Sequence, residues 1–472
     1  MQAKKSRSKL SALAICLATP LSIAALPTLA QNPADVIPAD AETLTLSAAR
    51  LQALKAHSSV QQASALTASA KAREREAHSG KLPMVAIQGA ASDGPAGAPA
   101  FGSIGNPASF GALPYSVQGL AADPLKKQFG IGLNISQNLF DSGRTQSLTA
   151  AKSSLVTAAQ EDETAQRSLI TLAVTQKYLN VLALQELLSV QKEMLQQRVA
   201  TEQQAKLFTD AQLKAGVDLQ TAAAHTSEAR VALIGAENDL RAGFADLNNA
   251  MGATSLKSFR LTPVPDAGPV VNGTLETFTE KALRLRPELS SADASLKAEE
   301  HTLRGVKSEL HPRVDAVASL GIINPGSLIH NSQNYAVGVA VTIPVFTGGQ
   351  IEGRVQEEKE KQKAAVAQRE SVKESIRLQV ARAWLELETR RAQMSAARDQ
   401  MQAANSSLAL ASERYKLQLS SLIELSDSET TAARARAAFV NARYAVQMAS
   451  QLLAWASGDP VYVPAAGMKG GK

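Results

Sequence analysis

One stretch of alternating residues occurs twice in this chain, and it constrains the fold more than any other feature. Residues 129–144 and residues 335–350 both alternate large apolar side chains with small or polar ones, and both end in a glycine turn. Phe346 lies 206 residues after Phe140, and since this offset is even, the apolar residues keep the same face in both copies. An alternation over about eleven residues is long enough for a tilted strand to cross a bilayer.

Each stretch therefore has one face that is suited to lipid. The residues predicted to face lipid are Ile131, Leu133, Ile135, Val337, Val339 and Val341. The residues of the opposite face are small or polar, namely Gly130, Gly132, Asn134, Ser136, Ala336, Gly338, Ala340 and Thr342. An apolar outer face and a polar inner face are typical of the strands of a transmembrane β-barrel.

Long helices are predicted for most of the remaining sequence. Aromatic residues make up only 4% of the chain, too few for the core of a compact domain of this size. Residues 142–215 contain no proline, and no glycine after Gly143, so they predict a helical rod of about 67 residues and ~100 Å. Residues spaced by three or four along this rod share one helix face and predict a packing seam rather than a cofactor site, at Ile170, Val174, Tyr178, Val181, Gln185 and Leu188. The predicted fold class is mainly α, with membrane β-strands.

The sequence divides into a leader, two repeats of the same plan, a linker and a tail. Residues 1–30 are predicted to be a signal peptide, 253–274 a linker rich in proline and glycine, and 459–472 a C-terminal tail. The first repeat, 31–252, is predicted to hold a helix at 47–82, strands at about 84–92 and 128–140, and helices at about 142–215 and 217–251. The second repeat, 275–458, is predicted to hold a helix at about 275–311, strands at about 313–323 and 334–346, and helices at about 349–418 and 420–456.

The N-terminus has the layout of a secretory signal peptide. Four basic residues precede an apolar run at 10–29, and small residues around Ala30 offer a cleavage site. Removing residues 1–30 takes away those four positive charges and lowers the net charge from +6 to +2, which argues against a nucleic-acid partner. The single cysteine, Cys16, lies within the apolar run. Because Ile15 is bulky where a lipid-attachment motif needs a small residue, we do not expect lipidation there.

No catalytic, cofactor-binding or metal-binding residues are predicted. The six histidines show no ligand spacing, and no nucleophile lies in a recognisable elbow. Gly130 and Gly132 lie within a predicted strand, so they do not form a dinucleotide-binding fingerprint. We therefore expect a protein that is not an enzyme and carries no cofactor.

The predicted strands require more than one copy of the chain. Four strands cannot close a barrel, and an open strand edge in lipid leaves backbone groups unpaired at several kcal/mol each. Two copies would supply about eight strands and three copies about twelve, and only the larger number could leave an open lumen. The chain is therefore predicted to associate.

Short motifs next to the strands give the chain a family resemblance. Residues 80–83 (Gly-Lys-Leu-Pro) and His311-Pro312 precede the first strand of each pair, and residues 138–143 (Asn-Leu-Phe-Asp-Ser-Gly) and 344–349 (Pro-Val-Phe-Thr-Gly-Gly) follow the second. In this order the motifs and the internal repeat resemble the outer-membrane efflux protein family of TolC-like channels. The resemblance implies a homotrimer in outer-membrane lipid, with a β-barrel of about twelve strands, a helical barrel that crosses the periplasm, and a belt formed by the linker and the termini.

The resemblance also implies a function and its partners. Channels of this kind are passive exit ducts for tripartite efflux or type I secretion, and they dock on an inner-membrane transporter through a periplasmic adaptor. Positions of the family's gate are occupied here by Tyr415, Glu424, Asp427 and Thr221. Ser420 and Ala222 depart from the family, which has an arginine and an aspartate at these positions.

The acidic gate residues have two readings. Carboxylates at i and i+3 share one helix face, and three copies would bring six of them into a narrow ring that attracts cations. Alternatively, Glu424 and Asp427 complement the dipole at the start of a helix.

The helix turns are predicted to dock the adaptor. The residues concerned are Gly216, Val217, Leu419, Ser420, Ser421 and Leu422, and exposed leucine or valine there would be the expected footprint. A simple turn between two helices is the alternative. Two rival interpretations of the whole chain are a periplasmic coiled-coil adaptor without a channel and a filament-forming helical protein.

Overall fold

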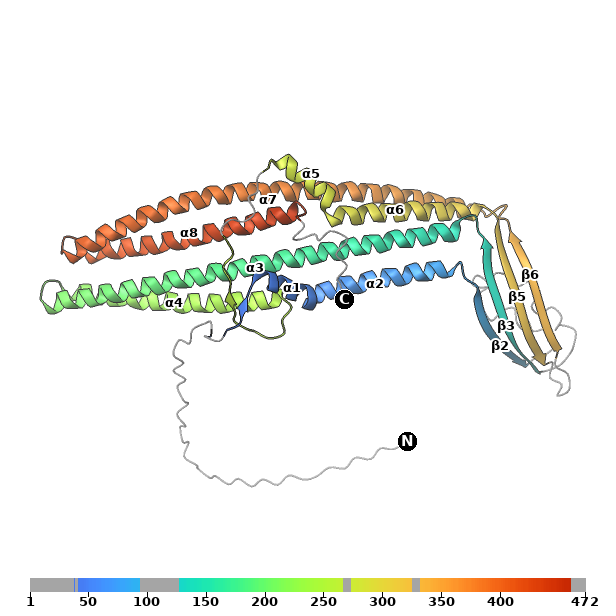
Figure 1. The fold of residues 1–472 in the computed structure, drawn as a ribbon, viewed down its shortest axis with the longest axis horizontal. Helices are drawn as coiled ribbons and strands as arrows, with labels where there is room; N and C mark the ends of the chain where they lie inside the picture. The colour runs from blue at the N-terminus through green and yellow to red at the C-terminus, as the bar shows by residue number, and fades with distance from the viewer. Residues whose placement is uncertain (1–37, 39–40, 94–126, 266–272, 325–331, 460–472) are drawn as a thin grey trace, which may run out of the picture.

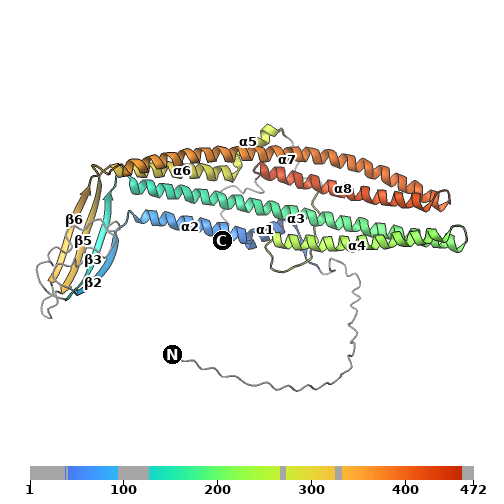
Figure 2. The same ribbon diagram turned by 180° about the vertical axis from the view of Figure 1, so that it is seen from behind.

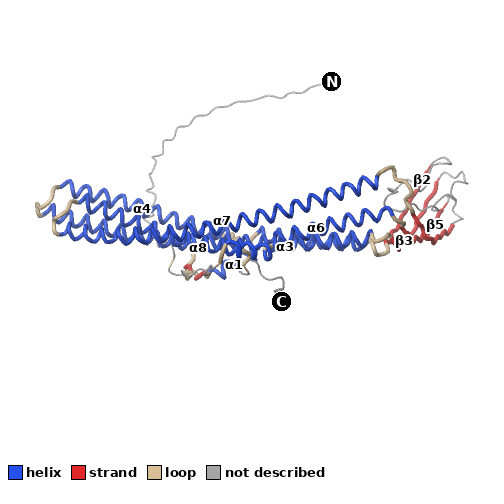
Figure 3. Tube along the Cα trace, turned by 90° about the horizontal axis from the view of Figure 1, so that it is seen from above, coloured by secondary structure: helices blue, strands red, loops and turns tan. Residues whose placement is uncertain are grey.

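The structure is a computed structural model that describes Pro38 and residues 41–93, 127–265, 273–324 and 332–459. The predicted signal peptide with Cys16, part of the predicted linker and nearly all of the predicted tail lie outside these residues. The molecule is elongated, with a sheet at one end and two helical turns at the other (Figure 1). Seen from above, the helices form a long, narrow body and the strands are confined mainly to one end (Figure 3).

Two long helices run the length of this body. They are α3 (Arg144–Asp210) and α7 (Gln350–Lys416), each of 67 residues. Two helices of 35 residues each return alongside them from the far end, namely α4 (Gly216–Ala250) and α8 (Leu422–Ala456). α3 also contacts α8, so the helices lie in the order α4, α3, α8, α7 (Figure 2). None of the helices within the described residues contains a stretch apolar enough to cross a membrane.

The helix that precedes each strand pair is broken, which the sequence analysis did not predict. In place of one helix at 47–82 there are α1 (Leu46–Ala56) and α2 (Ser58–Ser79), and in place of one at 275–311 there are α5 (Leu275–Leu285), α6 (Pro287–Lys307) and a short 3₁₀ helix (Ser308–Leu310). Arg286 is extended because the ring of Pro287 disfavours helical backbone in the residue before it. His57 is equally extended without a proline, and its Nδ1 accepts a hydrogen bond of 3.2 Å from Ser59 N.

These breaks let shorter helices follow one another along each long helix. Gly252, two residues beyond the end of α4, lies against the α1–α2 break, and Gly458, two residues beyond the end of α8, lies against the α5–α6 break. Along the half nearer the sheet, α2 packs on α3, and α6 packs on both α3 and α7. The body formed by the packed helices therefore keeps about the same width from the sheet to the far end.

The sheet has four antiparallel strands in the order β2-β3-β5-β6. These are β2 (Met84–Asp93), β3 (Lys127–Phe140), β5 (Arg313–Asn324) and β6 (Ser332–Thr342), and the β3–β5 pair joins the two halves of the chain. The strand predicted at 334–346 ends early, at Thr342, because Pro344 cannot donate a ladder hydrogen bond. A bulge between Asn138 and Phe140 shifts the register of β3 against β5.

The register gathers the predicted apolar residues on one face. Neighbouring strands place Val85, Ile135, Ala318 and Val337 in one row across the sheet, and Ile87, Leu133, Leu320 and Tyr335 in the next. Val337 is 81% exposed and Val339 64%, so this face is uncovered in the single chain. The other face is polar: Asn134 Nδ2 donates to Gln88 Oε1 (3.0 Å), and Asn138 Nδ2 donates to Asp315 Oδ1 (3.1 Å).

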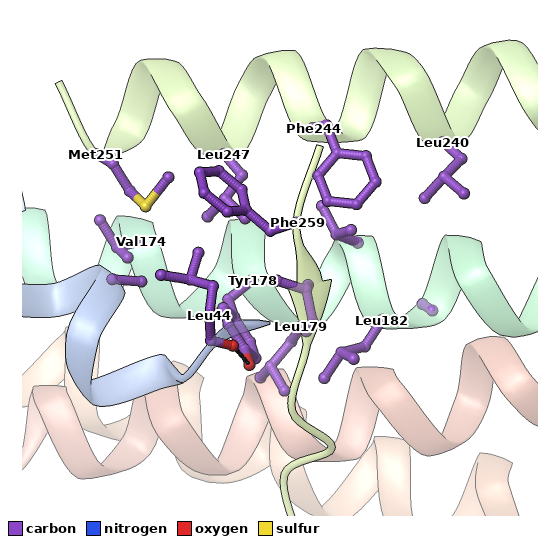
Figure 4. Close-up of a cluster of buried hydrophobic side chains, with 14 of the residues drawn as sticks. Leu44, Val174, Tyr178, Leu179, Leu182, Leu240, Phe244, Leu247, Met251 and Phe259 are labelled. Carbon is purple, nitrogen blue, oxygen red and sulfur yellow. Dashed lines mark hydrogen bonds between the residues drawn. The ribbon is translucent and has the colours of Figure 1, made fainter. Parts of the chain in front are cut away.

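A small two-stranded sheet crosses the middle of the body. β1 (Thr43–Leu44) pairs in parallel with β4 (Arg260–Leu261). Tyr178 of α3 is fully buried beneath it, and its hydroxyl donates toward the carbonyl oxygens of Leu44 and Thr262, each 2.8 Å away (Figure 4). The predicted seam around Tyr178 is thus confirmed as packing, since Val174 and Val181 are fully buried in the same cluster.

Candidate functional site

Two matching turns form the end of the molecule opposite the sheet. One joins α3 to α4 and the other joins α7 to α8 (Figure 1). Gln212 (φ 59°) and Gln418 (φ 60°) both have left-handed backbone, and the next residue in each turn donates back to the helix: Leu213 N to Phe208 O and Leu419 N to Arg414 O, both at 2.8 Å. This is the Schellman arrangement, which ends a helix sharply. Each chain reversal is therefore short and well defined.

Tyr415 packs the two hairpins together close to these turns. Its side chain is fully buried, and its ring meets Phe208 of α3 edge-on, with centroids 5.8 Å apart. Burial, together with the nearby charges of Asp218 and Glu429, raises the pKa of the Tyr415 phenol. Its hydroxyl has no hydrogen-bond partner among the described residues, and Ala222 of the same cluster cannot provide one. Tyr415 therefore acts here as a neutral packing residue.

Glu424 and Asp427, predicted to act together, have different surroundings. Glu424 Oε1 lies 3.0 Å from Arg414 Nη1 across the turn, while Ser421 Oγ accepts a hydrogen bond of 3.2 Å from Glu424 N and caps α8. Asp427 is exposed and has no hydrogen bond or ion pair within the part of the chain that the structure describes. The same end of the molecule thus holds both carboxylates and Tyr415, but no hydrogen bond links them.

The remaining predicted residues of this end are divided between surface and interior. Gly216, Val217, Leu419 and Ser421 are exposed, whereas Thr221 is half-buried. Ser420 and Leu422 are buried, so the expectation of an exposed leucine at position 422 is wrong. Leu422 begins α8 and packs in the cluster of Tyr415 and Leu425, because the capped first turn of α8 points it inward.

A buried ion pair near this end was not predicted from the sequence. Arg198 Nη1 of α3 lies 2.6 Å from Glu429 Oε2 of α8, and their side chains are only 5% and 4% exposed. Thr201 Oγ1 donates to Glu429 Oε1 (2.7 Å), and Arg198 Nη2 donates to Thr430 Oγ1 (2.7 Å) and Ser426 O (3.1 Å). Burial raises the pKa of the Glu429 carboxyl, and the opposing effects of Thr201, Arg198 and His225 are smaller. In the sequence, Arg198 and Glu429 are two of many charged residues within predicted helices.

The described residues hold no cluster of three or more histidine, cysteine, aspartate or glutamate side chains suited to a metal ion. The arrangement at this end consists of packed helices, two short turns and paired charges. It is suited to holding helix ends together or to forming a contact surface.

Comparison with known proteins places the chain in a family. A family model described as "Outer membrane efflux protein" matches residues 49–253 and 279–459. The chain is 24% identical over 330 residues to the outer membrane efflux protein BepC of Brucella suis biovar 1, covering 70% of this chain and 72% of BepC. It is 22% identical over 333 residues to the cation efflux system protein CusC of Escherichia coli K12, covering 68% and 71% respectively.

Solved structures share the fold. The structure matches the CmeC outer membrane channel of Campylobacter jejuni with a TM-score of 0.72 and 19% identity, covering 88% of this chain and 85% of CmeC. Because the family match takes in both strand pairs and all four long helices, the chain belongs to the outer membrane efflux protein family and is an outer-membrane protein that extends into the periplasm.

Proposed function

We propose that three copies of this chain form an exit duct across the outer membrane and the periplasm, serving a tripartite efflux pump or a type I secretion system. The observation that carries the proposal is the sheet. One of its faces is apolar and exposed, and among the described residues its outer strands, β2 and β6, each pair with only one strand. In lipid, these two edges need partners, because an unpaired backbone group costs several kcal/mol there.

The copy number follows from the family. Channels of this family are trimers that work with adaptor proteins and inner-membrane transporters. Three sheets of four strands, joined β6 to β2, would close a barrel of about twelve strands. The helices of the three copies would close a tube below it. The rival readings, a periplasmic adaptor and a filament, have no comparable support, because the family match is to outer membrane efflux proteins.

The proposed duct would be narrowest at the helical turns. Asp427 is exposed and without a partner among the described residues, and Glu424, three residues earlier on α8, pairs with Arg414, so three copies could set a ring of carboxylates there. Thr221 and Tyr415 would support this ring from α4 and α7. The exposed Gly216, Val217, Leu419 and Ser421 would meet the adaptor, while the buried Ser420 and Leu422 would shape the turn from within.

Conductance measurements test this function. The purified protein should form channels in planar bilayers, and di- or trivalent cations should block them. Changing Glu424→Ala together with Asp427→Ala should weaken that block, because the carboxylates that bind the cations are gone. Asp210→Ala, an exposed acidic residue at the end of α3, is the matched control and should leave the block unchanged. Absence of any channel activity from the purified protein would overturn the proposal.

A further inference from the structure

Two charged contacts show how α8 is aligned on α3 within one copy. Arg436 Nη1 of α8 lies 3.3 Å from Glu193 Oε2 of α3, and Arg443 of α8 pairs with Glu186 of α3. The two α8 residues are seven apart, and so are their partners on α3, which follow in the opposite order, as antiparallel helices require. These contacts therefore define which level of α8 meets which level of α3.

The second half of the chain has the same helix lengths and spacing as the first. α7 begins and ends 206 residues after α3, and α8 begins and ends 206 residues after α4. In the row α4, α3, α8, α7, the helices α4 and α7 stand at the two ends, and no hydrogen bond or ion pair joins them among the described residues. In a ring of copies, α7 would meet α4 of the next copy as α3 meets α8 within one copy.

One charged contact of α3 with α8 has a counterpart at this boundary. The residue 206 positions after Glu193 is Asp399 of α7. The residue 206 positions before Arg436 is Arg230 of α4. Both side chains are exposed, and neither has a hydrogen bond or ion pair in the part of the chain that the structure describes. Asp399 also lies about 200° around α7 from the buried Ala397, so it points away from the core of its own copy.

A second pair of opposite charges lies about three turns away. Glu388 comes eleven residues before Asp399 on α7, and Arg241 comes eleven residues after Arg230 on α4. Eleven residues keep nearly the same helix face and span ~16 Å. Because the two helices would be antiparallel, Glu388 and Arg241 fall at one level. Both are exposed, and within the described ranges neither is paired.

An exposed isoleucine lies between the two arginines of α4. Ile234 is 65% exposed, whereas Val440, 206 residues later on α8, is only 8% exposed because it packs in the cluster of Tyr178. Large apolar side chains exposed in this way mark a surface that a partner covers. The α7 residues level with Ile234 are Ser395 and Ala396, which are exposed and small enough to leave room for it.

We propose that Arg230 and Arg241 of α4 pair with acidic residues of α7 in the neighbouring copy. The partners are Asp399 for Arg230 and Glu388 for Arg241, and Ile234 is covered between them. The inference rests on the proposed function, because it needs three copies in a ring. Exposed ion pairs add little stability, but complementary charges favour one alignment of two surfaces. Sliding α4 by one turn would separate both pairs at once.

Cross-linking between cysteines tests this alignment. The only natural cysteine is Cys16, in the predicted signal peptide. The matched variants are Arg230→Cys with Asp399→Cys, and Arg241→Cys with Glu388→Cys. The mismatched variants exchange these partners, which would place the thiols ~16 Å apart along the helices. Each purified protein is treated with a bifunctional methanethiosulfonate too short to span that distance, and is run on denaturing gels with and without reductant.

We expect the matched variants to give covalent dimers and trimers that reductant releases, and the mismatched variants to remain single chains. Glu193→Cys with Arg436→Cys is the control for the reagent, since its thiols should be consumed while the mass of one chain is kept. Native trimers without covalent products from the matched variants, or stronger linking of the mismatched ones, would overturn the alignment and leave the duct intact. A protein that is monomeric in detergent would count against the proposed function itself, and the pairs would fall with it.

Reversing the charges gives a second test without a linker. Arg230→Asp should lower the temperature at which the trimer dissociates in detergent, because two acidic side chains would then face each other at every boundary between copies. Adding Asp399→Arg should restore that temperature. Failure of the double variant to recover would show that residues 230 and 399 do not meet.

Discussion

Gly252 lies directly against the backbone of His57. A Cβ added to Gly252 would stand 2.8 Å from His57 Cα and 2.9 Å from His57 N. The second half of the molecule repeats this contact, since a Cβ on Gly458 would stand 2.9 Å from Leu285 Cβ. Both glycines have left-handed backbone, with φ of +69° and +74°. Glycine is therefore required twice at the junctions where one short helix gives way to another.

Gly252→Ala should destabilise the protein by about 2 to 4 kcal/mol, because it adds backbone strain to a clash with backbone atoms. Thermal unfolding followed by circular dichroism measures the effect. Gly235→Ala is the control, since Gly235 lies within α4 and its Cβ would meet nothing within 4 Å. That change should stabilise the helix by up to about 1 kcal/mol. Equal stability of the Gly252→Ala variant and the native protein would refute the requirement for glycine.

Removing the hydroxyl from each of two buried tyrosines should change the stability of the protein by different amounts. Tyr178→Phe should cost about 1 kcal/mol or more, because the hydroxyl donates to backbone carbonyls that tie the small sheet to α3. Tyr415→Phe should change stability by less than about 0.5 kcal/mol, because its hydroxyl has no partner among the described residues. Chemical denaturation of both variants checks this. A larger cost at 415 than at 178 would show that the Tyr415 hydroxyl is bonded after all.

The helices and strands could be predicted from the sequence more fully than the junctions between them. The alternation that contains Leu133 and the uninterrupted run behind Gly143 suffice for β3 and α3, because both patterns are local. The break at His57 has no such local signal. The burial of Leu422 and the Arg198–Glu429 pair depend on which helices lie side by side, and one helix's sequence does not contain that information.

The Arg198–Glu429 pair should behave as a coupled unit. Arg198→Met alone or Glu429→Met alone should cost about 3 to 5 kcal/mol, because each leaves an uncompensated buried charge. The double variant should recover most of that loss, since two apolar side chains can fill the same space. A double-mutant cycle by chemical denaturation measures the coupling. The exposed Lys177–Asp246 pair is the control and should couple by less than about 1 kcal/mol.

Alkaline pH should weaken the contact between α3 and α8 at Tyr444. Burial and the hydrogen bond to Glu186 raise the pKa of Tyr444 to about 12, from an ordinary value of 10.0. The contribution of this group to stability is complete below pH 10, where both folded and unfolded chains keep the proton. It is lost as the pH rises from 10 toward 12, because only the unfolded chain releases its proton readily there. Denaturation at several alkaline pH values should show a steeper loss for the native protein than for Tyr444→Phe.

The apolar face of β6 should be required for membrane insertion. Val339→Asp with Val341→Asp should prevent assembly in the outer membrane, because two carboxylates would face lipid in every copy. Ala336→Asp is the control: Ala336 belongs to the opposite face of the same strand, where it pairs with Ser319, and its variant should still insert. Fractionation of the membranes checks both variants. Normal outer-membrane levels of the double variant would show that this face does not contact lipid.

The common length of α3 and α7, 67 residues each, limits how this molecule could ever be made longer or shorter. One inserted residue turns everything beyond it by about 100°. On α8, Arg443 pairs with Glu186 of α3 and Arg436 pairs with Glu193, so an insertion in α3 alone would carry Glu186 and Glu193 away from these partners. Insertions of whole heptads, about 10.5 Å each, would keep the partners aligned, provided that α8, α4 and α7 gained the same length. The reach of the molecule can therefore change only in coarse steps made in four helices together.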